Sequence, residues 1–184
     1  LAALTAAGAA RGADGAAWRR RAERFYRVSV DTADAVRLLM YRQMAPYLLA
    51  LDGPVVAAIE HTRWDAPGAD VAAAPERPYV QTVRDELATL GARLDCLRRM
   101  GYLPARPALY LWESVCIHVM DVLLEGYGRV RRCSNAGRAA MLMDTQAVAD
   151  ALAAASGGLR PLPGAAPVET FVKAFYLPAD DLLA

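Results

Sequence analysis

Residues 109–146, LYLWESVCIHVMDVLLEGYGRVRRCSNAGRAAMLMDTQ, decide the fold class of this chain. Placed on a helix at about 100° per residue, the first half of this stretch carries apolar side chains over more than half of the circumference. The polar strip is narrow: Ser114, His118, Asp121, Glu125, Arg129 and Arg132. Because a surface helix shows an apolar stripe of only about 100°, the pattern predicts a central helix from Trp112 to Val130 enclosed by other helices.

A short basic connection, which we call the joint and which contains Arg129, Arg131 and Arg132, follows the central helix. A second helix begins after it. Cations at the joint complement the dipole of the preceding helix end, and Ser134 or Asn135 can cap a helix that runs to about Ala155. Gly137 could expose backbone N–H groups to an anion or let this helix pass close to a neighbour. We favour close packing, because no strand and no glycine-rich loop precede Gly137. The joint supplies a candidate partner or membrane surface, formed by Arg129, Arg131, Arg132 and Arg138.

Helix patterns recur along the rest of the chain, whereas strand patterns are nearly absent. We expect helices at residues 18–26, 31–51 with a kink at Pro46, 54–61, 79–100 and 168–177, with a loop at 66–78. The chain is therefore predicted to be an all-α, multi-helix bundle. Residues 1–23 form an Ala/Gly-rich linker or an entering helix, and residues 24–184 form the bundle. The predicted core includes Trp112, Val119, Leu123, Tyr127, Met141, Phe171 and Phe175.

Charge and composition exclude several classes of partner. The formal net charge of +1 gives no overall field that would favour nucleic acid. No uninterrupted apolar run reaches the roughly 18 residues of a membrane-spanning helix, so we expect none. Three cysteines without close pairing argue against a disulfide framework and for a reducing compartment. The cytosol is the expected location.

Catalytic and metal-binding patterns are missing from the sequence. Cys116 and His118 are two residues apart and point about 200° from each other on a helix, so they cannot share one metal ion. No nucleophile stands in a recognisable catalytic context. We therefore expect neither an enzyme nor a cofactor. Asp144 could accept an arginine from a partner, but we favour an internal pair with Arg138 or Arg160.

Short motifs follow one another in a fixed order along the chain. They are Arg63-Trp64-Asp65, Tyr79-Val80, Leu111-Trp112-Glu113, Glu125-Gly126-Tyr127, Cys133-Ser134-Asn135, Gly137-Arg138-Ala139 with Met141, Asp144 and Gln146, Leu159-Arg160-Pro161-Leu162-Pro163, and the run from Val168 to Leu177. This ordered set resembles the C-terminal region of the syndetin family over Thr62 to Leu177, and more weakly over Arg24 to His61. The alanine-rich background and the Pro/Ala-rich insertion at Pro67–Pro78 depart from the family pattern.

The resemblance implies a function. Syndetin is the distinguishing subunit of the endosome-associated recycling complex, a multisubunit vesicle tether of the helical-rod (CATCHR-type) class. The resemblance therefore implies a non-catalytic scaffold that acts in endosomal recycling, peripherally on recycling endosomes or trans-Golgi membranes. Other tether subunits are the implied partners, with SNAREs, small GTPases and weak contact with anionic membrane as further candidates. The alternative is an all-α small-ligand-binding domain, with a pocket of above about 300 Å³ beside the central helix, lined by Trp112, Tyr127 and methionines.

Overall fold

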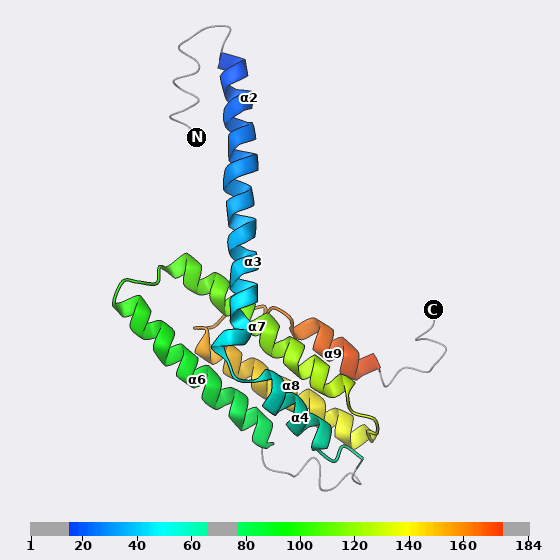
Figure 1. The fold of residues 1–184 in the computed structure, drawn as a ribbon. Helices are drawn as coiled ribbons and strands as arrows, with labels where there is room; N and C mark the ends of the chain where they lie inside the picture. The colour runs from blue at the N-terminus through cyan, green and yellow to red at the C-terminus, as the bar shows by residue number, and fades with distance from the viewer. Residues whose placement is uncertain (1–14, 66–76, 175–184) are drawn as a thin grey trace. The chain divides into compact units, whose positions relative to one another are not determined.

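The structure, a computed structural model, describes residues 15–65 and 77–174 of the chain. Within these ranges every regular element is a helix and there is no strand, which confirms the all-α prediction (Figure 1). The expected loop at 66–78 falls almost wholly outside the described residues, as do Phe175 and the end of the last predicted helix.

The chain divides into two compact units, residues 1–40 and 41–184. The first unit holds α2 (Gly15–Phe25), the π-helical turn η2 (Tyr26–Val30) and the part of α3 (Asp31–Leu48) up to Met40, and the rest of α3 belongs to the second unit. α3 contains Pro46 in its last turn, where proline has no backbone N–H to donate to the carbonyl of Arg42, so the helix end lacks one intrahelical hydrogen bond. The predicted boundary at residue 24, between a linker or entering helix and the bundle, stays a prediction.

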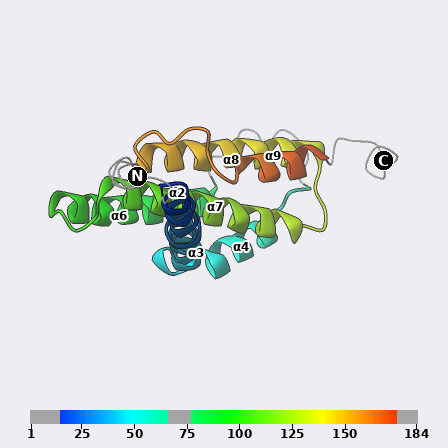
Figure 2. The ribbon, with the colours of Figure 1, turned by 90° about the horizontal axis from the view of Figure 1, so that it is seen from above.

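Five helices of the second unit form the bundle. They are α4 (Asp52–His61), α6 (Pro78–Arg99), α7 (Ala105–Gly128), α8 (Asn135–Ala155) and α9 (Ala165–Ala174). α4 packs on α6 and α7, α9 packs on α7 and α8, and α8 packs on α6, so that the five helices close around one core. Figure 2 shows α8 and α9 side by side in one layer, with α7 between this layer and α4.

The central helix α7 is enclosed as its pattern indicates. Trp112, Val119, Leu123 and Tyr127 are buried, and Met141 on α8 joins the same core. Each large apolar side chain removed from water stabilises the fold by about 1.5–3 kcal/mol before the cost of ordering it. Among the described helices α7 has the most buried residues, so its packing contributes strongly to the stability of the bundle.

The last helix docks differently from the prediction. We expected Phe171 and Phe175 to hold it. Phe175 lies outside the described residues, and the buried side chains of α9 are Val168 and Val172. These valines are four residues apart and share one face. Phe171 is offset from the middle of that face by about 80°, and it lies half-buried at the edge of the core.

Two further side chains were placed on the wrong side of their helices. Ser114 was expected on the polar strip but is buried, and its hydroxyl donates to the carbonyl of Tyr110, 2.9 Å away. This back-bond to the preceding turn satisfies the hydroxyl without water. The spacing of Val83, Leu87, Leu90 and Leu94 also predicts Leu97 on the core face of α6, but that face ends at Leu94 and Leu97 is exposed.

One described helix, α7, is long and apolar enough by length and composition to cross a membrane. We expected no such segment, because Asp121 and Glu125 interrupt the apolar run. More than half of the most apolar part of α7 is buried inside the bundle. The core helix of a bundle passes the same test, and the contacts of α7 with α4, α8 and α9 account for its composition.

Candidate interaction surface

The connection between α7 and α8 lies against the segment that follows α4. The carbonyl oxygen of Trp64 accepts two hydrogen bonds from Ser134, one from its backbone N–H at 2.9 Å and one from its hydroxyl at 3.0 Å. The Ser134 hydroxyl oxygen also accepts from the N–H of Gly137, 3.1 Å away, and so caps α8 as predicted. A single serine therefore ties two connections together and starts a helix.

Gly137 is required by this close approach. A Cβ atom on Gly137 would lie 2.1 Å from the Trp64 carbonyl oxygen and 3.0 Å from the Cys133 sulfur. The first of these neighbours is backbone, which cannot turn aside as a flexible side chain can. The close-packing interpretation of Gly137 is confirmed.

Trp64 forms the inner wall of the joint. Its side chain is buried, its ring N–H donates to the carbonyl of Ile59 at 2.8 Å, and its ring meets that of Tyr127 edge to face with centroids 6.0 Å apart. The guanidinium carbon of Arg77 lies 4.8 Å from the centroid of the Trp64 ring. In the sequence, Trp64 stood out only as part of a family motif, because a tryptophan just beyond a helix end carries no periodic signal.

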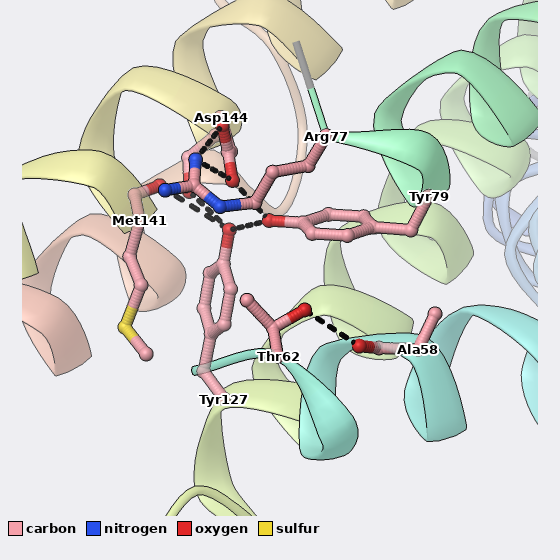
Figure 3. Close-up of polar contacts among 8 residues, drawn as sticks. Ala58, Thr62, Arg77, Tyr79, Tyr127, Met141 and Asp144 are labelled. Carbon is pink, nitrogen blue, oxygen red and sulfur yellow. Dashed lines mark hydrogen bonds and ion pairs between the residues drawn. The ribbon is translucent and has the colours of Figure 1, made fainter. Parts of the chain in front are cut away.

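Arg77 also belongs to a buried polar cluster (Figure 3). One guanidinium nitrogen of Arg77 contacts both carboxylate oxygens of Asp144, at 2.8 and 2.9 Å. The hydroxyl of Tyr79 donates to Asp144 at 2.5 Å and lies 3.2 Å from the hydroxyl of Tyr127, which also donates to the carbonyl of Met141. The cluster thus joins α6, α7 and α8 at one point.

The internal pair expected for Asp144 exists, and it includes Arg77, which was not one of the two arginines considered. Arg160, one of the two partners that we considered, pairs with Asp150 instead, at 3.0 Å. Arg77 and Asp144 are 67 residues apart, and helix periodicity cannot identify a contact at that separation.

Burial controls the ionisation of the two phenols. It raises the pKa of Tyr127 to about 12, and burial together with neighbouring Tyr127 and Asp144 raises the pKa of Tyr79 well above its ordinary value. Both hydroxyls therefore stay neutral at physiological pH and can donate. The arrangement is one ion pair held by neutral donors, which is suited to fixing three helices together.

The outer face of the joint is a basic groove of about 350 Å³, which we call the joint groove. Its lining residues are Glu60, Thr62, Arg63, Trp64, Asp65, Arg129, Val130, Arg131 and Arg132. Three of the four predicted arginines line it, and Arg63 joins them from the segment after α4. Arg129 pairs with Glu125 at 2.5 Å and lies 3.9 Å from Glu60.

Arg138 does not belong to this groove. It is half-buried beside Cys133, whose pKa is raised by burial and lowered less strongly by the Arg138 guanidinium. Arg138 therefore lies beneath the joint rather than on its accessible face.

Two other grooves share no lining residue with the joint groove. One is at the end of α6, lined by Asp95, Arg98 and Arg99, and one is on α2 and η2. Neither these two nor the joint groove is lined by Trp112, Tyr127 or a methionine, so none of the three corresponds to the ligand pocket considered as an alternative. In the part of the chain that the structure describes, no three His, Cys, Asp or Glu side chains are arranged to hold a metal ion.

Comparison with known proteins identifies relatives. The family model described as "Syndetin, C-terminal" matches residues 16–184. Syndetin of Gallus gallus is 28% identical over 160 residues, and syndetin of Mus musculus is 29% identical over 161 residues. Each alignment covers 87% of this chain but 16% of the relative, so the chain spans about a sixth of the length of these relatives. No solved structure matches the chain.

Proposed function

The chain belongs to the syndetin C-terminal family, and from this premise we propose that it is a non-catalytic domain of a vesicle-tethering subunit that acts in endosomal recycling. The observation that carries the proposal is the family match over residues 16–184, which includes all five helices of the bundle. The proposed activity is binding to other proteins, without turnover.

The packing of the bundle supports a scaffold role. Its largest side chains are used internally: Trp64, Tyr79, Tyr127 and Met120 are almost completely buried. Asp144, the one buried carboxylate among the described residues, is already neutralised by Arg77. What the bundle offers to a partner is therefore its outer shape and its exposed charges.

The joint groove is the proposed docking surface. Four arginines line it against two carboxylates, and arginine binds carboxylate or phosphate groups through paired hydrogen bonds. Its walls are held by the Trp64–Ser134 hydrogen bonds, so the arginine backbones are pre-positioned, which reduces the entropy lost on binding. An acidic segment of another tether subunit fits this chemistry best.

The finer elements of the proposal follow from the family. Other subunits of the tethering complex are the primary partners, and SNAREs or small GTPases are further candidates. The proposed location is the cytoplasmic side of recycling endosomes or trans-Golgi membranes, with the domain peripheral to the bilayer.

Affinity purification of the complete polypeptide that carries this domain tests the proposal. We expect other tether subunits to co-purify with it. The charge-reversal variant Arg131→Glu/Arg132→Glu should lose at least one of them, because the groove would then repel an acidic segment. The matched control Arg98→Glu/Arg99→Glu changes the charge equally at the end of α6 and should lose none.

Each outcome decides a different part of the proposal. Recovery of no tether subunit with the unmodified protein would refute the tethering function. Recovery of the same subunits with both variants would leave the tethering function standing but would exclude the joint groove as the docking surface.

A further inference from the structure

The first unit carries a stripe of exposed aromatic side chains. Trp18, Phe25 and Tyr26 are 41%, 64% and 44% exposed. Together with Arg21 and Ala22 they line a shallow, mainly apolar groove of about 540 Å³ on α2 and η2. Large aromatic side chains gathered in one exposed groove mark a surface that contacts something apolar.

The rest of this helix is strongly basic. Residues 15–30 contain Arg19, Arg20, Arg21, Arg24 and Arg27 against a single acidic residue, Glu23. At about 100° per residue, Trp18, Ala22 and Phe25 fall within about 60° of one another. Arg20, Arg24 and Arg27 fall on the opposite side. The segment is therefore a basic amphipathic helix with an aromatic face.

We propose that residues 15–30 bind the surface of an anionic phospholipid bilayer, with Trp18, Phe25 and Tyr26 among the lipid headgroups. Helices with an arginine-rich polar face and an aromatic apolar face lie in the plane of the bilayer interface. Tryptophan and tyrosine prefer this depth, because each has a large apolar body and one polar group.

The distribution of charge favours a bilayer over a partner helix. A partner helix would contact the stripe and the residues beside it, and would leave Arg20, Arg24 and Arg27 without a role. The negative potential of an anionic membrane attracts every basic residue within a Debye length, about 8 Å at physiological ionic strength. All five arginines would then contribute.

Tryptophan fluorescence gives a direct test on the 184-residue chain. Of the three tryptophans, Trp64 and Trp112 are 1% and 7% exposed, whereas Trp18 is exposed. Vesicles of phosphatidylcholine and phosphatidylserine should therefore shift the emission to shorter wavelength through Trp18 alone. Vesicles of phosphatidylcholine alone should produce little shift, and the variant Trp18→Phe should show no shift with either.

Paired variants distinguish vesicle binding by this helix from vesicle binding by the rest of the protein. In vesicle sedimentation, Arg20→Glu/Arg24→Glu should weaken binding about tenfold or more. The control Arg98→Glu/Arg99→Glu, which changes the net charge equally on α6, should weaken it much less. Trp18→Ala/Phe25→Ala should weaken binding, whereas Leu109→Ala/Met143→Ala, which removes exposed apolar side chains from the bundle, should not. Circular dichroism of each variant checks that helix content is retained.

Three results would overturn the proposal. Equal binding to neutral and anionic vesicles is the first, and equal loss in the two charge-reversal variants is the second. The third is a shift of Trp18 emission with rising protein concentration and no vesicles, which would show that a second copy covers the stripe. The vesicle assay contains no tether subunit, so its outcome is independent of the tethering function.

Discussion

The two units of this chain are built from similar helices but bury them to opposite extents. In the first unit, Val36 and Leu39 on α3 are 50% and 58% exposed, whereas Val119 and Leu123 on α7 in the bundle are completely buried. All four are branched aliphatic residues within helices. Residue type and helix formation therefore do not determine burial, which depends on whether neighbouring helices are present.

Ion pairs show the same difference. Arg37 and Asp34 in the first unit are 2.6 Å apart, with half of each side chain exposed. Arg77 and Asp144 in the bundle are 2.8 Å apart, with 13% and 8% exposed. The two distances are alike, but only the bundle pair has been removed from water. Loss of one partner therefore leaves a buried, uncompensated charge only in the bundle.

Substitution of the two aspartates gives the largest expected effect. Asp144→Ala should lower the free energy of unfolding of the bundle by about 3–5 kcal/mol, because it leaves Arg77 buried without its counter-charge. Asp34→Ala should lower it by no more than about 1 kcal/mol, since exposed pairs contribute little. Urea denaturation followed by circular dichroism measures both. Equal effects would show that the Arg77 pair is hydrated.

A pair of leucines extends the comparison to apolar contacts. Leu123→Ala should cost about 2–5 kcal/mol, the sum of lost transfer free energy and the cavity left between α7 and its neighbours. Leu39→Ala on α3 should change the free energy of unfolding by no more than about 0.5 kcal/mol. A large cost at Leu39, measured in the same denaturation assay, would mean that the first unit has a packing partner in solution.

Two glycines of the bundle test whether the close approach of the two connections requires glycine at position 137. Gly137→Ala should cost about 1–3 kcal/mol, because the new methyl group meets the Trp64 carbonyl and must move one of the two connections. Gly128→Ala meets nothing within 4 Å and should stabilise the end of α7 by up to about 1 kcal/mol. Thermal unfolding midpoints of the two variants should move in opposite directions. Movement in the same direction would contradict the assigned role of Gly137.

Local patterns predicted the helices well and the contacts between them poorly. The cap at Ser134 depends on residues close in the sequence, and so does the end of α6 just before Gly101, whose φ is 79°. The broad apolar arc that predicted the enclosure of α7 also lies within one helix. The pairing of Arg77 with Asp144 spans 67 residues, and no periodicity encodes it. The docking of α9 through Val168 and Val172 was missed because aromatic residues were given more weight than helix phase.

The candidate site was predicted in part for the same reason. Arg129, Arg131 and Arg132 are consecutive or nearly so, and their common location follows from the chain itself. Arg63 reaches the same groove from a connection that only the fold brings close. Arg138 is near the others in sequence, but the first turn of α8 carries it beneath the joint beside Cys133.

Alkaline pH gives the smallest expected effect and probes the buried phenols directly. The pKa of Tyr127 is about 12 in the folded protein and about 10 in the unfolded chain, so between these values the folded state binds the proton more tightly. Its contribution to stability is complete below pH 10 and is lost as the pH rises toward 12, at about 1 kcal/mol per pH unit. Unfolding by urea at pH 9 and pH 11 measures this slope. Tyr127→Phe should reduce it, and Tyr102→Phe, which removes an exposed phenol, controls for the loss of a tyrosine. The first unit has no buried phenol among its described residues. A slope that survives Tyr127→Phe unchanged would therefore come from other groups with raised pKa: Tyr79, the thiol of Cys133, or the buried thiol of Cys116, whose pKa is also about 12. The polar cluster would then depend less on Tyr127 than its hydrogen bonds indicate.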